Sequence, residues 1–133
     1  MIIQAEETLL PQIYKLLDNI KDAPKANLSR MMKDGLSNLN EIILAYLEDY
    51  TVKGFLYATV DKFDGERSVF IQAAYMEPNK KYLGVTEAAF DKLCYWAKQK
   101  GINRMDIITT RVPEAFQRRW GFAYTGTLMK RRI

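Results

Sequence analysis

Residues 69–101 read VFIQAAYMEPNKKYLGVTEAAFDKLCYWAKQKG, and two different periodicities meet in this stretch. Apolar and aromatic residues alternate from Val69 to Tyr75, which is typical of a β-strand. After Gly84 the apolar residues recur three and four positions apart until Gly101, which is typical of an amphipathic helix that stops at a glycine. The stretch therefore predicts a strand, a loop beginning at EPN, and a helix.

The flanking sequence supplies further elements on both sides. Runs of β-branched and aromatic residues at 42–47 and 52–60 predict two strands that precede the first, in antiparallel succession. The remaining expected elements are a short apolar start at Ile2 and Ile3, helices over Leu9–Ile20, Leu28–Leu39 and Pro113–Trp120, and strands over Arg104–Thr109 and Phe122–Met129. The order β-α-α-β-β-β-α-β-α-β predicts an α/β (α+β) fold, a mixed and mostly antiparallel sheet flanked by helices, in one domain spanning residues 1–133.

Composition narrows the function classes. The chain has 133 residues, of which 48% are hydrophobic and 27% charged, as in ordinary globular proteins. No apolar stretch approaches the ~20 residues that a membrane span requires. A soluble, cytoplasmic protein that does not enter a membrane is expected.

The counts of histidine and cysteine exclude several kinds of catalytic and metal site. Histidine is absent, so no mechanism can use an imidazole as base, proton shuttle or ligand. Cys94 is the single cysteine, which excludes an intramolecular disulfide and a cysteine-based zinc site. We expect no metal.

The charge balance favours an anionic ligand. The net charge is +4, with basic clusters at Arg118-Arg119 and in the terminal MKRRI. No helix-turn-helix, zinc-finger or ribonucleoprotein motif accompanies these clusters, so nucleic acid is not the expected partner.

Three segments in order carry a resemblance to a known family. They are TVKGFLYATV (51–60), the stretch from YMEPN to WAKQKG (75–101), and AFQRRWGFAYTGTLMKR (115–131). The last is similar to an FY-x-x-x-GF ending, with Phe116 at its start and Gly121-Phe122 at its close. In this layout the chain from about Val52 to Met129 resembles the GNAT N-acetyltransferase superfamily.

The resemblance implies acetyl-coenzyme A (acetyl-CoA) as co-substrate. Family members hold its pyrophosphate on backbone N–H groups of a Gln/Arg-x-x-Gly-x-Gly/Ala loop at a helix N-terminus, where unpaired amides favour anions. Lys81, Gly84 and Thr86 fall on the three motif positions, and Gly84 alone matches strictly. The cofactor-binding residues implied in this way are Met76, Lys80, Lys81, Tyr82, Leu83, Gly84, Val85, Thr86, Thr110 and Phe116.

The resemblance also implies direct attack of an amine on the thioester. Gln117 occupies the position where many members carry a tyrosine general acid, and SVFIQAAYM (68–76) contains no carboxylate to act as base. The catalytic candidates are Gln72, Tyr75, Gln117 and Tyr124. The amine acceptor, protein or small molecule, would be recognised by Leu9–Leu39, and a homodimer would form through Phe122–Met129.

A second hypothesis stays open beside the enzyme. Thr86 in the loop and Gln117 in the last helix are also compatible with a catalytically silent GNAT-like module that serves structure or protein interaction. The small size of the chain would suit a phage or mobile-element protein.

Overall fold

The computed structural model describes residues 1–20, 24–108, 123–125 and 128–132. Within these ranges the strands are β1 (Ile2–Gln4), β2 (Glu41–Glu48), β3 (Thr51–Phe63), β4 (Glu66–Met76), β5 (Arg104–Ile108), β6 (Ala123–Thr125) and β7 (Leu128–Arg132). The helices are α1 (Leu10–Leu17), α2 (Lys25–Gly35) and α3 (Val85–Gln99), with 3-10 turns η1 (Glu7–Leu9) and η2 (Lys80–Tyr82). The described strands form one sheet in the order β1-β2-β3-β4-β5-β7-β6.

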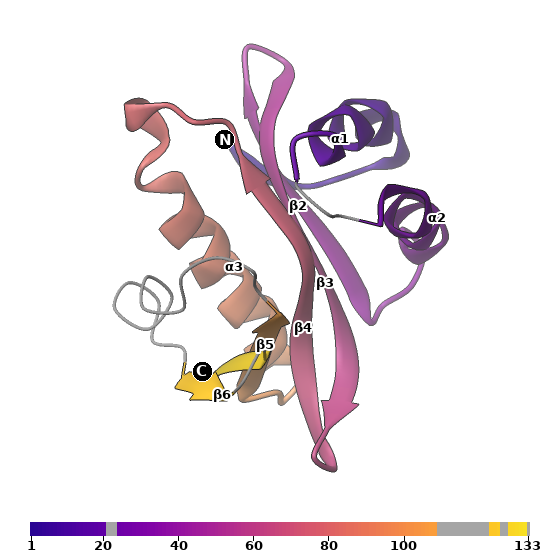
Figure 1. Ribbon diagram of the computed structural model, residues 1–133, viewed down its shortest axis with the longest axis vertical. Coiled ribbons are helices and arrows are strands. Elements are labelled where there is room, and N and C mark those ends of the chain that lie inside the picture. The colour runs from indigo at the N-terminus through magenta and orange to yellow at the C-terminus, as the bar shows by residue number, and fades with distance from the viewer. Residues whose placement is uncertain (21–23, 109–122, 126–127, 133) are drawn as a thin grey trace.

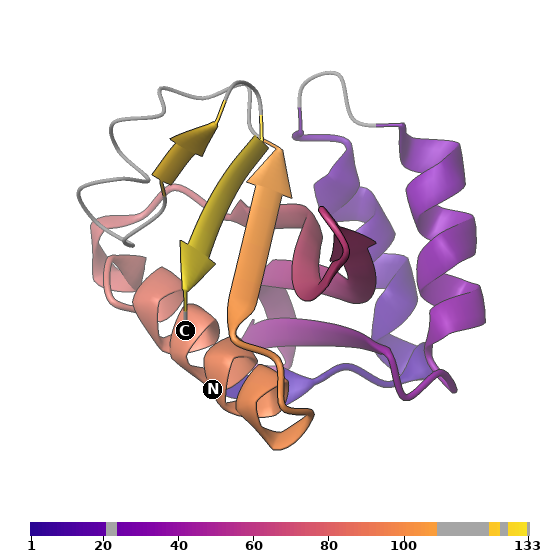
Figure 2. The same ribbon diagram turned by 90° about the horizontal axis from the view of Figure 1, so that it is seen from below.

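The sheet is antiparallel except at one place. β2, β3 and β4 pair in antiparallel succession, as the sequence predicted, and β1 adds a further antiparallel partner to β2, whereas β5 runs parallel to β4. The connection between those two strands is α3, since a parallel pair requires a crossover. Figure 2 shows β5, β7 and β6 side by side, extending the sheet beyond β4.

Helices cover both faces of the sheet. In Figure 1, α3 lies on one face, and α1 and α2 lie together on the other. Alternate strand residues therefore enter two separate cores. Leu56 and Ile71 pack with Phe90 and Leu93 on the α3 face. Phe55 packs with residues of α1 and α2, including Ile13 and Met32, on the opposite face.

Most sequence-predicted elements are confirmed, with shifted ends. The first helix is shorter than the predicted Leu9–Ile20 because η1 precedes it and a turn follows Leu17. The second begins earlier than predicted, at Lys25, where Leu28 N–H bonds the carbonyl of Pro24. It ends at Gly35, because glycine is a poor helix former. The helix predicted over Pro113–Trp120 lies outside the described residues.

The single last strand predicted over Phe122–Met129 is wrong. The described residues form two strands instead, β6 and β7, which pair antiparallel with Tyr124 opposite Met129. Gly126 is the sequence signal that divides this run, because glycine weakens a strand interior. The final strand, β7, pairs with β5 and continues to Arg132.

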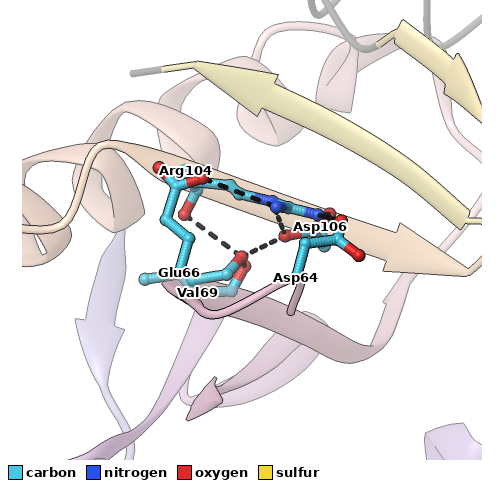
Figure 3. Close-up of polar contacts among 6 residues, drawn as sticks. Asp64, Glu66, Val69, Arg104 and Asp106 are labelled. Atoms are coloured by element: carbon cyan, nitrogen blue, oxygen red, sulfur yellow. Dashed lines mark hydrogen bonds and ion pairs between the residues drawn. The ribbon is translucent and has the colours of Figure 1, made fainter. Parts of the chain in front are cut away.

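A buried ion-pair cluster fixes the start of β5 (Figure 3). Asp106 has no exposed surface and accepts hydrogen bonds from Arg104 Nε at 2.8 Å and from Ser68 Oγ. The same guanidinium, whose side chain is 3% exposed, forms ion pairs with Asp64 at 3.4 Å and Glu66 at 3.5 Å. The cluster therefore ties β5 to the β3–β4 turn and to the beginning of β4.

No helix among the described residues has the length and apolar character needed to span a membrane.

Candidate active site

The two parallel strands at the centre of the sheet stop pairing part-way along. β4 pairs with β5 from Val69 to Ile71, opposite Met105 to Ile107. β4 then continues to Met76 while bonded on its other side to β3. Along 72–76, the edge of β4 that faces away from β3 has no ladder partner among the described residues. Among the described residues, this edge of β4 is the part of the central sheet where an extended ligand could pair as an added strand.

A β-bulge between β3 and β4 lies where β4 stops pairing with β5. Tyr57 pairs with Ala73 and Ala58 with Ile71, so Gln72 is the extra residue of the bulge. Its Nε2 lies 3.0 Å from Thr59 Oγ1, which lies 2.9 Å from Asp61 Oδ2. A carboxylate only accepts hydrogen bonds, so Thr59 donates to Asp61 and accepts from Gln72. The carbonyl oxygen of Gln72 keeps its capacity to accept, and no described residue donates to it.

Tyr57 extends this polar face toward α2. Its hydroxyl donates to Glu41, and burial, followed by the bond to Glu41, raises the pKa of Tyr57. A tyrosine whose pKa is raised in this way gives up its proton less readily than an ordinary tyrosine, which makes it a poor general acid. Tyr57 therefore has a structural role in the core against α1 and α2.

The N-terminus of α3 has unpaired backbone amides. Gly84 is the N-cap, without a side-chain cap, and its carbonyl accepts from Ala88 N–H at 3.2 Å. The amides of residues 84–87 have no hydrogen-bond acceptor among the described residues. A Cβ added at Gly84 would meet nothing within 4 Å. Space and donors suited to an anion thus occur together at this helix end.

The turn before α3 is attached to the end of β2. Glu48 accepts from Lys81 Nζ at 2.8 Å and from the Tyr82 hydroxyl at 3.2 Å. The Tyr82 ring, 3% exposed, packs edge-to-face against Tyr46 with centroids 5.4 Å apart. We call Tyr46, Glu48, Lys81 and Tyr82 the β2–η2 clamp.

Electrostatics in the β2–η2 clamp reflect these contacts. The hydrogen bond from Lys81 lowers the pKa of Glu48, and the same bond raises the pKa of Lys81. Burial, with the bond to Glu48 as the next cause, raises the pKa of Tyr82. Lys81 thus stays protonated beside an ionised Glu48 at neutral pH.

The predicted loop residues occupy different environments. Leu83 is exposed, Tyr82 is buried, and Val85 and Thr86 are half-buried in the first turn of α3. Lys80 is exposed at the start of η2. The structure therefore brings these residues together at one end of α3, where Tyr82 is buried and its backbone N–H donates to the carbonyl of Asn79.

Two predicted residues lie on β4 next to this loop. Met76 is opposite Gly54, where an added Cβ would come within 2.6 Å of the Met76 methyl group and 2.8 Å of the Tyr75 carbonyl. Gly54 is therefore required for close approach of β4 to β3. Tyr75 is half-buried and packs against the core on the α1 and α2 face.

The side chains of four predicted residues are outside the structural description. Thr110, Phe116 and Gln117 lie outside the described residues. Tyr124 is described as a backbone position in β6, opposite Met129, and its side chain is outside the description.

Sequence reasoning missed Glu48, Thr59 and Asp61. Glu48 lies 33 positions before Lys81, and Thr59 lies 13 positions before Gln72, so no local pattern links them. The only signal was the alternation of Thr59 and Asp61 along β3, which places their side chains on the same face of that strand. Among the described ranges, no group of three His, Cys, Asp or Glu side chains is placed to hold a metal ion.

No protein-family model matches the sequence, and no curated protein matches it. Solved structures do match over nearly the whole chain. An aminoglycoside antibiotic 6'-N-acetyltransferase from Acinetobacter haemolyticus has 20% identity and a TM-score of 0.79, covering 95% of this chain and 92% of its own. The chain has the GNAT fold.

Two further GNAT-fold structures show how broad the similarity is. A predicted acetyltransferase from Clostridium acetobutylicum, solved with acetyl-CoA, has 16% identity and a TM-score of 0.75, covering 94% of this chain and 90% of its own. A ribosomal-protein-alanine N-acetyltransferase from Brucella melitensis has 15% identity and a TM-score of 0.76, covering 100% and 99%. At these identities the similarity establishes the GNAT fold of this chain.

Proposed function

We propose that the protein is an acyl-CoA-dependent N-acyltransferase, with acetyl-CoA as donor and an amine as acceptor. The observation that carries this proposal is the N-terminus of α3, where the amides of 84–87 have no acceptor in the described part of the chain and Gly84 has open space on its Cβ side. Solved structures with the same fold include one that contains acetyl-CoA.

Gly84 is not required by the fold. Its φ of −86° is accessible to any residue, and no heavy atom lies within 4 Å of an added Cβ. By contrast, Gly101 at the other end of α3 has a φ of 72°, which favours glycine for conformational reasons. A diphosphate approaching the α3 amides would give Gly84 a role that the protein alone does not.

The unpaired edge of β4 supplies the second part of the site. The backbone of 72–76 has no partner on this side among the described residues, and an extended chain with amide groups can bond such an edge, as an added strand does. Coenzyme A carries such an arm between its diphosphate and its thiol, and its acetyl thioester supplies the activated acyl group. Residues 84–87 and 72–76 would therefore hold the two halves of one ligand.

Gln72 is the polar group best placed for the acceptor. Its amide N–H is engaged by Thr59, so its carbonyl oxygen can accept a hydrogen bond from an amine. An amide cannot take up a proton, and the chain has no histidine. We therefore propose that acceleration arises mainly from positioning the amine beside the thioester, with the amine proton leaving through water.

Isothermal titration with acetyl-CoA and with CoA tests the proposal. At low salt we expect dissociation constants of roughly micromolar order that rise at higher salt, because salt screens the attraction between the charged diphosphate and the N-terminus of α3. Gly84→Glu should abolish binding in a folded protein, because the new carboxylate enters the space beside the amides. Gly101→Ala, at the other end of α3, should lower stability by about 1 kcal/mol and leave the dissociation constant unchanged.

Failure of the wild-type protein to bind either ligand at millimolar concentration would overturn the acyltransferase proposal. It would instead favour a GNAT-fold module that serves structure or interaction. If binding is observed, thiol release from acetyl-CoA with a panel of amines then identifies the acceptor class.

A further inference from the structure

The β2–η2 clamp reaches the proposed cofactor loop from outside it. Glu48 is the last residue of β2, and both of its bonded partners, Lys81 and Tyr82, lie in η2. From Tyr82, a single residue, Leu83, leads to the Gly84 N-cap. The position of the α3 amides therefore depends on a turn that Glu48 holds.

Other contacts hold the same segment more weakly. Asn79 Oδ1 accepts from Lys81 N–H at 3.1 Å, which shapes η2 locally without attaching it to the sheet. Lys53 and Glu77 form an ion pair at 3.6 Å between exposed and half-exposed side chains. Glu48 is distinct because one carboxylate joins a charged group and a buried tyrosine to the same strand end.

Glu48 has two opposing effects on an anionic ligand. Its negative charge repels phosphate, and removing that charge alone would tighten binding. Its hydrogen bonds fix η2, and losing them would let the loop amides depart from the geometry that the ligand needs. The buried position of Tyr82 favours the second effect, because its hydroxyl would lose its partner when Glu48 is truncated.

We propose that Glu48 is a positioning residue for CoA binding, acting through Lys81 and Tyr82 on the backbone of the loop before α3. This inference rests on the proposed function. It assigns Lys81 as a tether of the loop, in place of a direct phosphate ligand.

Titration of CoA into four variants tests the inference. Glu48→Ala should raise the dissociation constant about tenfold, a loss of ~1.4 kcal/mol. Glu48→Gln should stay within about threefold of wild type, because its amide oxygen still accepts from Lys81 and Tyr82. Tyr82→Phe keeps the ring against Tyr46, and its dissociation constant should lie between those of the two Glu48 variants. Asp18→Ala is the matched control, since it removes an exposed 3.0 Å ion pair with Lys25 away from the loop.

Each outcome separates the two proposals. Tighter binding by both Glu48 variants would show that charge repulsion dominates and would overturn the inference alone, as would an unchanged constant for Glu48→Ala. No binding by the wild-type protein would overturn the proposed function and this inference with it. Thermal melting of every variant, with titration well below its midpoint, ensures that the constants refer to folded protein.

Discussion

Glu48 is a single carboxylate whose ionisation reports on the loop before α3. The hydrogen bond from Lys81 depresses its pKa below the ordinary value of 4.5. A depressed carboxyl pKa contributes stability above the unfolded value and loses it as pH falls through the folded value. The contact between β2 and η2 should therefore persist at neutral pH and weaken on acidification below 4.5.

NMR titration of the Glu48 side-chain carboxyl carbon measures this directly. Lys81→Met removes the largest cause of the shift, so the Glu48 pKa should move up toward 4.5. Lys25→Met, which removes a cation that does not contribute to the Glu48 shift, should leave the Glu48 pKa unchanged. An unchanged Glu48 pKa in Lys81→Met would contradict the ion pair.

Tyr50 occupies a turn conformation that suits glycine. It follows Asp49 in the two-residue turn between β2 and β3, and the two residues have φ of 52° and 63°. Such turns favour Asn-Gly, because a side chain in the left-handed region costs about 1–2 kcal/mol. Tyr50 is 94% exposed, so its ring contributes little packing.

Tyr50→Gly should therefore stabilise the protein by about 0.5–1 kcal/mol, after the extra backbone entropy of glycine is subtracted. Urea unfolding measures the change. Tyr50→Ala is the control, since it removes the ring and keeps the Cβ. Equal stability of the two variants would contradict the conformational explanation.

Among the elements, those with their own periodicity were predictable from the sequence. The helix after Gly84 and the strand before Pro78 each carry enough apolar repeats to define their type. The final run did not, because residues on both sides of Gly126 are β-like, and the division into β6 and β7 depends on pairing between the two halves and with β5. The parallel contact between β4 and β5 also left no local trace, since it joins residues about 36 positions apart.

Attachment of β5 at its start depends on Asp106. It is fully buried, and the Arg104 side chain beside it is 3% exposed. Removing one partner of a buried ion pair leaves an uncompensated charge and costs ~3–5 kcal/mol. Asp106→Ala should lower the free energy of unfolding by about 3 kcal/mol, the lower end of this range, because Asp64 and Glu66 still compensate the charge of Arg104.

Ser68→Ala removes one hydrogen bond to the same carboxylate and should cost about 1 kcal/mol. Urea unfolding at neutral pH measures both variants. If Asp106→Ala loses less unfolding free energy than Ser68→Ala, the cluster does not fix β5.

At the scale of the molecule, the layout was predictable and the site was predictable in part. The order of elements through β5 and the mostly antiparallel sheet followed from the sequence, and Gly84 was located at the start of α3. The unpaired edge of β4 was not evident, because it depends on where two distant strands stop pairing. Glu48 was missed for the same reason: its partners are brought to it by the sheet.

The proposed site joins two parts of the molecule, so its ligand should stabilise the whole fold. CoA would bridge β4 and the N-terminus of α3, and a ligand that binds only the folded state adds about 2.7 kcal/mol at 100 times its dissociation constant. For a domain of this size that is a rise of roughly 10 °C in melting temperature. Differential scanning calorimetry with CoA measures it.

Pantetheine, which lacks the diphosphate, should give a much smaller rise, and Gly84→Glu should give none with CoA. An equal rise in wild type and Gly84→Glu would place the ligand elsewhere, because the amides of α3 would then contribute nothing to its binding.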